Sequence, residues 1–432
     1  MTPVLQCAGT FRVRQDDHVL DADALARLAA ARAESLAPHR GGRVAMFGSC
    51  ADEVLITLLA CQAAACELLL LRERVAAADD RWRALSVSAL LGQDGTPVPT
   101  GVAPGGCEGF AILLATSGTT GTPKVARHRV AALLGRVRPP RGTPDGIRWL
   151  LTYHPASFAG LQVLLTALTT GGELAATREA SVAAYAELAL ATRPTHVSGT
   201  PTFWRGLLLA LHGRTREVPV AFATLGGEAV DQGTLDRIAA AFPGVAVSHI
   251  YASTEAGALF AVRDGRAGFP AAWLESGVDG VRLRVVDGML EVSSPRAMDR
   301  YVSPGTASPL TEDGWLRTGD RVEIANERVV FLGRADATIN VGGAKVSPEA
   351  VESVLLELPD VADVRAFGVR NPITGEVVGV EIVPADGVDR DSLRTRVGEH
   401  ARARLPSPQV PRLIRFVEAI AASATGKKAR TA

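Results

Sequence analysis

The run Thr116 to Lys124 has the composition of a loop that holds phosphate groups. It reads Thr-Ser-Gly-Thr-Thr-Gly-Thr-Pro-Lys and directly follows an apolar run, Ala111 to Ala115, that predicts a strand. Such a loop can direct backbone N–H groups, hydroxyls and an ammonium at polyphosphate oxygens. The spacing is not that of the ordinary P-loop, because Gly118 precedes Lys124 by six residues and a valine follows the lysine. The alternative is a polar surface turn. The candidate phosphate contacts are Thr116, Ser117, Gly118, Thr119, Thr120, Gly121 and Lys124.

Lysine is scarce in this chain. Of 46 basic residues only Lys124, Lys345, Lys427 and Lys428 are lysine, and the other 42 are arginine. This bias indicates a GC-rich genome in which arginine stands wherever either cation serves. The remaining lysines are therefore candidates for positions that need a compact ammonium. For Lys428, chance is an equally good explanation.

Five further motifs follow the loop, and each combines residue types that can bind a nucleotide or take part in catalysis. They are Gly226-Gly-Glu228, Tyr251-Ala-Ser-Thr-Glu255, Arg317-Thr-Gly-Asp320, Gly333-Arg-Ala-Asp336 continuing through Ile339 to Pro348, and Thr425-Gly-Lys427 with Arg430. In this order, and together with the loop, they resemble the adenylate-forming superfamily of acyl-CoA synthetases, peptide-synthetase adenylation domains and luciferases. The family's phosphate loop is similar to T-S-G-[ST]-T-G-x-P-K, which this chain matches without a gap. Six motifs in order are specific to the family, whereas one alone would not be.

A nucleoside can be recognised by side chains in three of these motifs. Tyr251 offers a flat face for an adenine ring, and Gly226 and Gly227 permit close approach of the backbone to the base. Asp320 is expected to accept both ribose hydroxyls, although an aspartate in Thr-Gly-Asp could also be an ordinary turn residue. Arg334 resembles the family arginine near the ribose and phosphate. The predicted nucleotide contacts outside the loop are Gly226, Gly227, Glu228, Tyr251, Asp320 and Arg334.

The resemblance also implies which residues act on the phosphates. Thr254 would hydrogen-bond the α-phosphate and Glu255 would ligate Mg²⁺, a hard cation that prefers carboxylate and phosphate oxygens. Glu255 could instead be an acid at the start of a helix. Lys427 matches the catalytic lysine, whose ammonium neutralises charge that builds on the phosphates in the transition state. Asp336 matches the hinge between the two domains. Lys345 follows that hinge and could assist a thiol substrate or be a solvated loop residue.

The pocket for a carboxylic acid is expected between the helix near Gly160 and the strands ending at Ser198, Thr224 and Ile250. Peptide-synthetase domains place an aspartate here to pair an α-ammonium, but Tyr153 to Gly160 contains no acid. An unpaired buried ammonium is costly, so the predicted substrate lacks an α-amino group. The predicted pocket residues are His154, Phe158 and Ser198, with Trp204 nearby. His154 matches a gating position in relatives; it and the aromatic residues could equally be packed in a core.

Strands and helices alternate in the first part of the chain, which predicts βαβ units and mostly parallel sheets covered by helices. The expected strands are 43–47, 67–71, 111–115, 195–198, 220–224 and 245–250. The expected helices are 52–65, 160–168, 201–211 and 232–241.

The pattern changes after about Gly280. Short strands are expected at 281–286, 289–292, 315–324 and 328–332, with Asp287-Gly288 as a hairpin turn. They predict a small β-barrel-like part. A compact α+β pattern follows, with helices at 348–358 and 391–403 and strands at 364–369, 378–383 and 413–417. Ser347 is the expected cap of the first of these helices, with Pro348 at its first position. The prediction is a large N-terminal domain, 1–335, and a small mobile C-terminal domain, 336–432.

Composition limits the partners, the metal sites and the cellular location that the protein is expected to have. The 46 basic and 46 acidic residues balance, which removes the simplest case for a nucleic-acid or anionic-membrane partner. The five cysteines have no paired or C-x-x-C spacing, which predicts a reducing compartment and no structural zinc. No secretory signal or membrane span is expected, so the predicted location is the cytoplasm. Only 115 residues precede Thr116, so the resemblance implies a trimmed N-terminal subdomain.

The predicted function is that of an AMP-forming acid–thiol ligase. The resemblance implies that ATP and Mg²⁺ activate a small-molecule carboxylic acid to an acyl-adenylate with release of pyrophosphate. A thiol then displaces AMP after the C-terminal domain swings about Asp336. Coenzyme A is the expected thiol, and the phosphopantetheine of an acyl carrier protein is the alternative. A nucleotide-binding protein without turnover is the alternative of another class.

Overall fold

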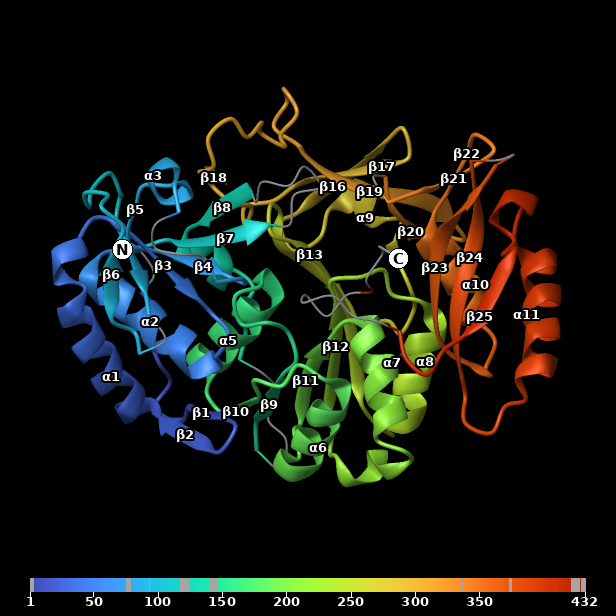
Figure 1. Cartoon of the computed structure of the whole chain (residues 1–432), viewed down its shortest axis with the longest axis horizontal. Helices are drawn as coiled ribbons and strands as arrows, with labels where there is room; N and C mark the ends of the chain where they lie inside the picture. The colour runs from blue at the N-terminus through green and yellow to red at the C-terminus, as the bar shows by residue number, and fades with distance from the viewer. Residues whose placement is uncertain are drawn as a thin grey trace.

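The structure is a computed structural model in which helices pack around several β-sheets (Figure 1). It describes residues 4–74, 79–92, 94–116, 124–139, 146–335, 337–372, 375–420 and 428. In the two largest sheets the central strands are parallel neighbours. The predicted α/β fold with parallel-rich sheets is therefore confirmed.

The first sheet has eight strands in the order β14-β13-β12-β11-β9-β10-β1-β2. Only the two outermost pairs are antiparallel. Its strands are β1 (Arg12–Gln15), β2 (His18–Asp21), β9 (Arg148–Leu151), β10 (Glu173–Ala176), β11 (His196–Gly199), β12 (Phe222–Gly226), β13 (Ala246–Ser253) and β14 (Gly257–Val262). The four helices that connect them are α5 (Phe158–Thr170), α6 (Val182–Thr192), α7 (Pro201–Ala210) and α8 (Gln232–Ala241). Each helix begins after a side-chain cap, namely Ser157, Ser181, Thr200 and Asp231.

The second sheet has the order β18-β8-β7-β4-β3-β5-β6. Its strands are β3 (Arg43–Phe47), β4 (Glu67–Leu71), β5 (Val87–Leu91), β6 (Pro97–Pro99), β7 (Ile112–Thr116), β8 (Lys124–His128) and β18 (Arg300–Tyr301). Its helices are α1 (Ala22–Ser35), α2 (Ala51–Ala64), α3 (Arg81–Ala84) and α4 (Val130–Leu134). One apolar core contains side chains of α2, α5 and both sheets, so the two sheets pack as one body.

A buried ion cluster explains the single charge in the apolar strand β4. Glu67 is 1% exposed, and its two carboxylate oxygens accept hydrogen bonds from Arg43 (2.7 Å) and Arg127 (2.6 Å). Burial alone would raise the pKa of Glu67, but the two arginines lower it below its ordinary value. Arg127 also pairs with Asp299, which directly precedes β18. The cluster therefore joins β3, β4, β8 and the segment that carries β18.

The small β-barrel-like part is also confirmed, as an antiparallel sheet in the order β15-β20-β19-β17-β16. Its strands are β15 (Phe269–Pro270), β16 (Arg282–Val286), β17 (Met289–Ser293), β19 (Leu316–Ala325) and β20 (Arg328–Arg334), with helix α9 (Trp273–Ser276). The predicted hairpin turn at Asp287-Gly288 has φ values of 50° and 73°, as a tight β16–β17 turn requires.

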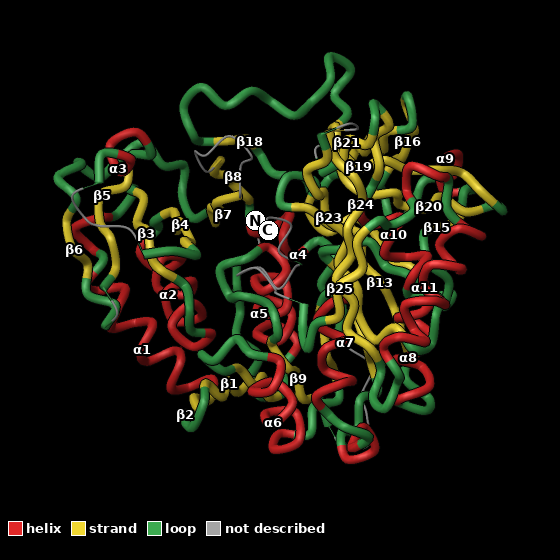
Figure 2. The backbone as a smooth tube through the Cα atoms, turned by 45° about the vertical axis from the view of Figure 1, so that its right-hand side comes forward, coloured by secondary structure: helices red, strands yellow, loops and turns green. Residues whose placement is uncertain are grey.

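The C-terminal sheet lies against α7 and α8 (Figure 2). Its strands are β21 (Ile339–Val341), β22 (Ala344–Val346), β23 (Val361–Asn371), β24 (Gly375–Pro384) and β25 (Leu413–Phe416), with helices α10 (Pro348–Leu355) and α11 (Arg390–Arg404). Ser347 caps α10 as predicted, because its hydroxyl accepts the Ala350 N–H at 3.3 Å. This part has its own apolar core. The boundary at residue 336 stays a prediction, since Asp336 lies outside the described residues.

Short 3₁₀ turns lie at Ala37–His39, Arg214–Glu217 and Ser407–Gln409. All five cysteines are free thiols. No helix in the described part of the chain combines the length and apolar content needed to cross a bilayer.

The buried His128 predicts acid sensitivity. Its ring is 0% exposed and packs 5.7 Å from that of Phe158, and burial lowers its pKa to about 4. An unfolded histidine titrates near pH 6.5, so this stabilisation is complete above that pH and is lost as the pH falls toward 4, by about 3 kcal/mol. Burial also lowers the pKa values of His154 and His196, so protonation of these residues adds to the loss of stability in acid. In His128→Gln the apparent melting temperature should fall less between pH 6.5 and 4 than in the unmodified protein. Exposed His212→Gln is the control, and equal slopes in both variants would contradict the prediction.

Candidate active site

The carboxyl ends of parallel strands in the first sheet meet at one edge. In the register Ser198 pairs with Leu151 at the end of β9, and Gly226 at the end of β12 pairs with Ile250 of β13. The Tyr153 hydroxyl, just beyond β9, donates to the Gly226 carbonyl at 3.1 Å. Residues that are widely spaced in the sequence therefore line a single edge.

Tyr251 joins this edge to the antiparallel sheet. Its hydroxyl donates to the Asp320 carboxylate, and its ring packs 4.8 Å from Phe331 and 5.5 Å from Phe260. Burial and the Asp320 charge raise the pKa of Tyr251 well above its ordinary value. The phenol therefore stays protonated and donates to the carboxylate at neutral pH.

Asp320 and Arg334 lie opposite each other on β19 and β20. The Arg334 Nη1 atom lies 3.5 Å from Asp320 Oδ1 and donates to the Thr318 carbonyl at 2.5 Å. Gly319 has a φ of 77°, and a Cβ there would lie 2.9 Å from the Arg334 guanidinium. The positive φ favours glycine at this position, and its lack of a side chain leaves room for the guanidinium. The predicted ribose carboxylate and its arginine are brought together.

The part of the site next to the predicted phosphate loop contains Tyr301, which the sequence reasoning missed. The Tyr301 hydroxyl donates to Glu255 Oε1 at 2.8 Å, and the Lys124 ammonium lies 5.8 Å from the centre of the Tyr301 ring. Burial and Glu255 raise the pKa of Tyr301. Tyr301 reaches this place because β18 pairs with β8. No motif marks a tyrosine 46 residues beyond Glu255, so only the strand pairing reveals it.

The Lys124 end of the predicted phosphate loop lies next to Tyr301, which bonds Glu255. Thr116 and Lys124 pair across β7 and β8, and the Thr116 hydroxyl donates to the Lys124 carbonyl at 3.3 Å. Thr254 and Glu255 lie in the turn between β13 and β14. The alternative that Glu255 starts a helix is therefore wrong. The predicted site residues that fall outside the described residues are Ser117, Gly118, Thr119, Thr120, Gly121, Asp336 and Lys427.

Glu228 belongs to the Gly226 turn but contacts protein groups in this structure. Its Oε2 atom accepts hydrogen bonds from the Thr202 N–H (3.1 Å) and hydroxyl (2.8 Å). Its Oε1 atom accepts the Lys428 backbone N–H at 2.9 Å. Gly227 is exposed with a φ of 87°. The turn is thus held by helix α7 on one side and by the end of the chain on the other.

The predicted acid-pocket residues lie between the two large sheets. His154 is half-buried, accepts the Ala156 N–H at 3.2 Å, and has its ring 6.3 Å from that of Phe47. Burial and the nearby charge of Arg72 lower its pKa to about 4, so it is neutral at physiological pH. Phe158 is 9% exposed and belongs to the main core, and the Ser198 carbonyl accepts the Thr152 hydroxyl.

Two further residues, Trp204 and Arg72, lie near the predicted acid pocket. Trp204 is fully buried and donates to the Thr224 carbonyl at 3.1 Å, so it is a core residue. Arg72, which the sequence reasoning also missed, follows β4 as a half-buried guanidinium. Its position directly after a parallel strand was the available signal.

A protein-only metal site is absent from the described part of the chain, where no three His, Cys, Asp or Glu residues converge. A cation bound here would need oxygen ligands from a substrate as well as from Glu255.

Comparison with known proteins identifies the family. A family model described as AMP-binding enzyme matches residues 89–301, and one described as AMP-binding enzyme C-terminal domain matches residues 350–427. The probable 2-succinylbenzoate–CoA ligase of Mycobacterium tuberculosis (strain ATCC 25618 / H37Rv) is 30% identical over 340 residues, or 75% of this chain and 84% of that protein. The chain belongs to the AMP-binding enzyme family. The p-hydroxybenzoic acid–AMP ligase FadD22 of Mycobacterium marinum is 28% identical to this AMP-binding enzyme over 357 residues. The matched part covers 76% of this chain and 49% of FadD22.

Solved structures share the fold of this AMP-binding enzyme. The anthranilate CoA ligase AuaEII in complex with anthranoyl-AMP has a TM-score of 0.77 and 19% identity, covering 98% of this chain and 93% of that chain. The o-succinylbenzoate CoA synthetase of Bacillus subtilis in complex with OSB-AMP has a TM-score of 0.70 and 19% identity, with coverage of 97% and 94%.

The Tyr251–Asp320 bond can be tested by removing one oxygen. In Tyr251→Phe the ring contacts with Phe331 remain, but the hydrogen bond to a charged group is lost, at a cost of about 1.5–3 kcal/mol. Urea-induced unfolding should shift to lower concentration. Tyr185→Phe is the matched control, because Tyr185 is also buried and its hydroxyl has no hydrogen bond within the described residues. Equal shifts in the two variants would show that the bond with Asp320 contributes nothing.

Proposed function

We propose that the protein is an acid–thiol ligase that uses ATP to convert a carboxylic acid into an acyl-adenylate and then into a thioester. The observation that carries the proposal is the meeting of Tyr251, Asp320, Glu255 and the Lys124 end of the loop around one edge of the first sheet. The kinship with proteins named as CoA ligases supports the same reaction.

In the first step the substrate carboxylate attacks the α-phosphorus of ATP and pyrophosphate leaves. Tyr251 and the Gly226 turn would flank the adenine, and Asp320 would accept the ribose hydroxyls. Thr254 would donate to an α-phosphate oxygen, while Lys124 would neutralise phosphate charge. The Tyr301 hydroxyl donates to Glu255 and so orients that carboxylate toward the phosphates.

Glu255 has the properties of a magnesium ligand. It is half-buried, and only its Oε1 atom accepts a hydrogen bond in the described part of the chain, which leaves Oε2 open to a cation. Bound Mg²⁺ would offset negative charge on the phosphate oxygens. ATP itself would complete the ligand set.

The proposed acid lacks an α-amino group, since residues 153–160 contain no carboxylate to pair an ammonium. His154 and Phe158 are the proposed pocket residues, and the neutral His154 adds no positive charge. The names of the relatives, which refer to succinylbenzoate, hydroxybenzoate, ferulate and anthranilate, put aromatic acids first among the substrates to test.

The second step transfers the acyl group to a thiol, with AMP as the leaving group. We place Lys427 in the first step and propose that a C-terminal domain, 336–432, turns about Asp336 to admit coenzyme A. A carrier protein that bears phosphopantetheine is the second candidate acceptor, since it presents the same thiol. The five free thiols, which all lie between Cys7 and Cys107, are compatible with a cytoplasmic location.

Pyrophosphate exchange into ATP tests the proposed function. One acid of an aromatic and aliphatic panel should support exchange, and Lys427→Ala should lower its rate at least 100-fold, about 2.7 kcal/mol of transition-state stabilisation. Arg396→Met, which removes an exposed pair with Asp360, is the control and should retain exchange. Thioester detected by mass after addition of coenzyme A would identify the acceptor. ATP binding without exchange for any acid would favour a nucleotide-binding protein instead.

The ribose contact predicts a separate kinetic effect. Asp320→Asn should raise the KM for ATP about tenfold, because a neutral amide accepts hydroxyl hydrogen bonds more weakly than a carboxylate does. The KM for the acid should change little. Asp313→Asn, which alters an exposed carboxylate paired with Arg284, serves as the control. An unchanged KM for ATP in Asp320→Asn would remove Asp320 from the nucleotide site.

A further inference from the structure

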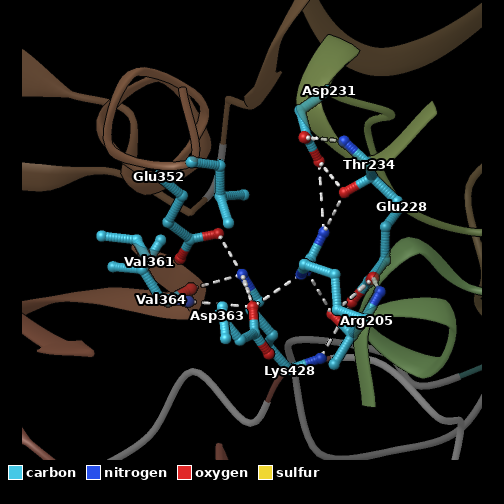
Figure 3. A network of polar contacts seen from close by, with 12 residues as sticks. Arg205, Glu228, Asp231, Thr234, Glu352, Val361, Asp363, Val364 and Lys428 are labelled. Atoms are coloured by element: carbon cyan, nitrogen blue, oxygen red, sulfur yellow. Dashed lines mark hydrogen bonds and ion pairs between the residues drawn. The ribbon is translucent and has the colours of Figure 1, made fainter. Parts of the chain in front are cut away.

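Buried charges gather where the C-terminal sheet meets α7 and α8, beside Glu228 of the Gly226 turn (Figure 3). The charged side chains that form this interface network are Arg205, Glu228, Asp231, Glu352, Asp363 and Lys428. All but Glu228 are at most 8% exposed. They come from both sides of the interface, because Arg205 is on α7, Asp231 caps α8, Glu352 is on α10 and Asp363 is on β23.

Asp363 is shared between the two sides. Its Oδ1 atom accepts a hydrogen bond from Arg205 Nε at 2.7 Å and lies 3.4 Å from the Lys428 ammonium. Burial alone would raise the pKa of Asp363, but Arg205 and Lys428 lower it below its ordinary value. Arg205 also pairs with Asp231 at 3.1 Å. Each cation therefore has a second carboxylate of its own beside the shared one.

Lys428 contacts both sides by different atoms. Its ammonium donates to Glu352 at 3.0 Å and to the Val364 carbonyl, which attaches the end of the chain to the C-terminal sheet. Its backbone N–H donates to Glu228, two residues beyond Gly226. Lys428 thus bridges the Gly226 turn and the C-terminal sheet.

Arg237 of α8 adds neutral contacts across the same interface. Its guanidinium donates to the carbonyls of Leu356, Leu358, Val361 and Ala362 at 2.8–3.2 Å. The turn after α10 is therefore held against α8 in one orientation. Breaking a buried ion pair by removing one partner is strongly unfavourable, but separation of the two sides would leave Arg205 with Asp231 and Asp363 with Lys428. Opening of the interface would therefore leave Arg205 and Lys428 each with a carboxylate, while the Arg237 guanidinium would exchange its carbonyl acceptors for water.

We propose that Lys428 is a positioning residue for the adenylation step and that Arg205–Asp363 is the ion pair that must break before thiol transfer. The inference rests on the proposed function. The backbone N–H of Lys428 bonds Glu228 of the Gly226 turn and its ammonium bonds Glu352, so this residue fixes the C-terminal sheet relative to that turn. Asp363 contacts both Lys428 and Arg205 of α7, so the restraint on Lys428 depends on the docking of the C-terminal sheet on α7.

Separate assays of the two half-reactions test the inference. Pyrophosphate exchange reports adenylation, and thioester formation from supplied acyl-adenylate and coenzyme A reports transfer. Lys428→Met keeps the length of the side chain and removes its charge, and should lower the exchange rate at least tenfold. The KM for ATP should stay within twofold, because Lys428→Met keeps the backbone N–H that bonds Glu228 and alters no side chain proposed to contact ATP. Transfer should also stay within twofold.

Arg205→Met is the second variant and acts from the other side of the interface. It should lower exchange in the same way, while transfer stays equal or rises because the interface opens more easily. Arg43→Met is the matched control, since it removes a buried arginine–glutamate pair confined to the second sheet. Any general loss of stability in that control should change both half-reactions by the same factor.

The ratio of exchange to transfer decides the outcome. A ratio lowered tenfold or more in Lys428→Met or Arg205→Met, with the Arg43→Met ratio unchanged, would support the inference. If the unmodified protein exchanges normally, equal loss of both half-reactions or an unchanged ratio in Lys428→Met and Arg205→Met would overturn this inference and leave the proposed function standing. Absence of exchange from the unmodified protein with every acid would overturn the proposed function and this inference together.

Discussion

The parallel register of the first sheet is the constraint on which the rest of the structure depends. Parallel strands place their carboxyl ends at one edge, so the segments after β9, β12 and β13 become neighbours although the chain separates them. The bond from Tyr153 to the Gly226 carbonyl fixes two of these segments together. A one-residue slip of β12 would turn Gly226 away from this edge and remove that contact.

Two other parts of the fold complete the edge without belonging to its sheet. The antiparallel sheet supplies Asp320, held by Tyr251, and the short strand β18 supplies Tyr301, which holds Glu255. In both cases a protonated phenol donates to a carboxylate, which fixes the acid while leaving its charge in place. The C-terminal sheet is joined to α7 and α8 near the same region through paired buried charges, in which each cation contacts two carboxylates.

Much of this organisation was accessible from the amino-acid sequence, because periodic apolar runs and ordered motifs report local structure. Even so, the helix predicted from Gly160 begins at Phe158, since Ser157 caps it by accepting the Gly160 N–H at 3.0 Å. Tyr301 could not be predicted, as its partner comes from strand pairing rather than from a motif. Lys428, for which chance was an equal explanation, is buried among carboxylates; such partners depend on how separate sheets pack, which no local pattern encodes.

The proposed function requires that one nucleotide contact the β7–β8 loop ends, the end of β13 and the β19–β20 pair together. Hydrogen–deuterium exchange with α,β-methylene-ATP and Mg²⁺ tests this requirement, because the analogue cannot undergo α–β cleavage. Slower exchange is expected in peptides covering 112–128, 246–255 and 316–334, all with the same dependence on analogue concentration. Protection confined to other segments, or different concentration dependence among these three, would contradict it.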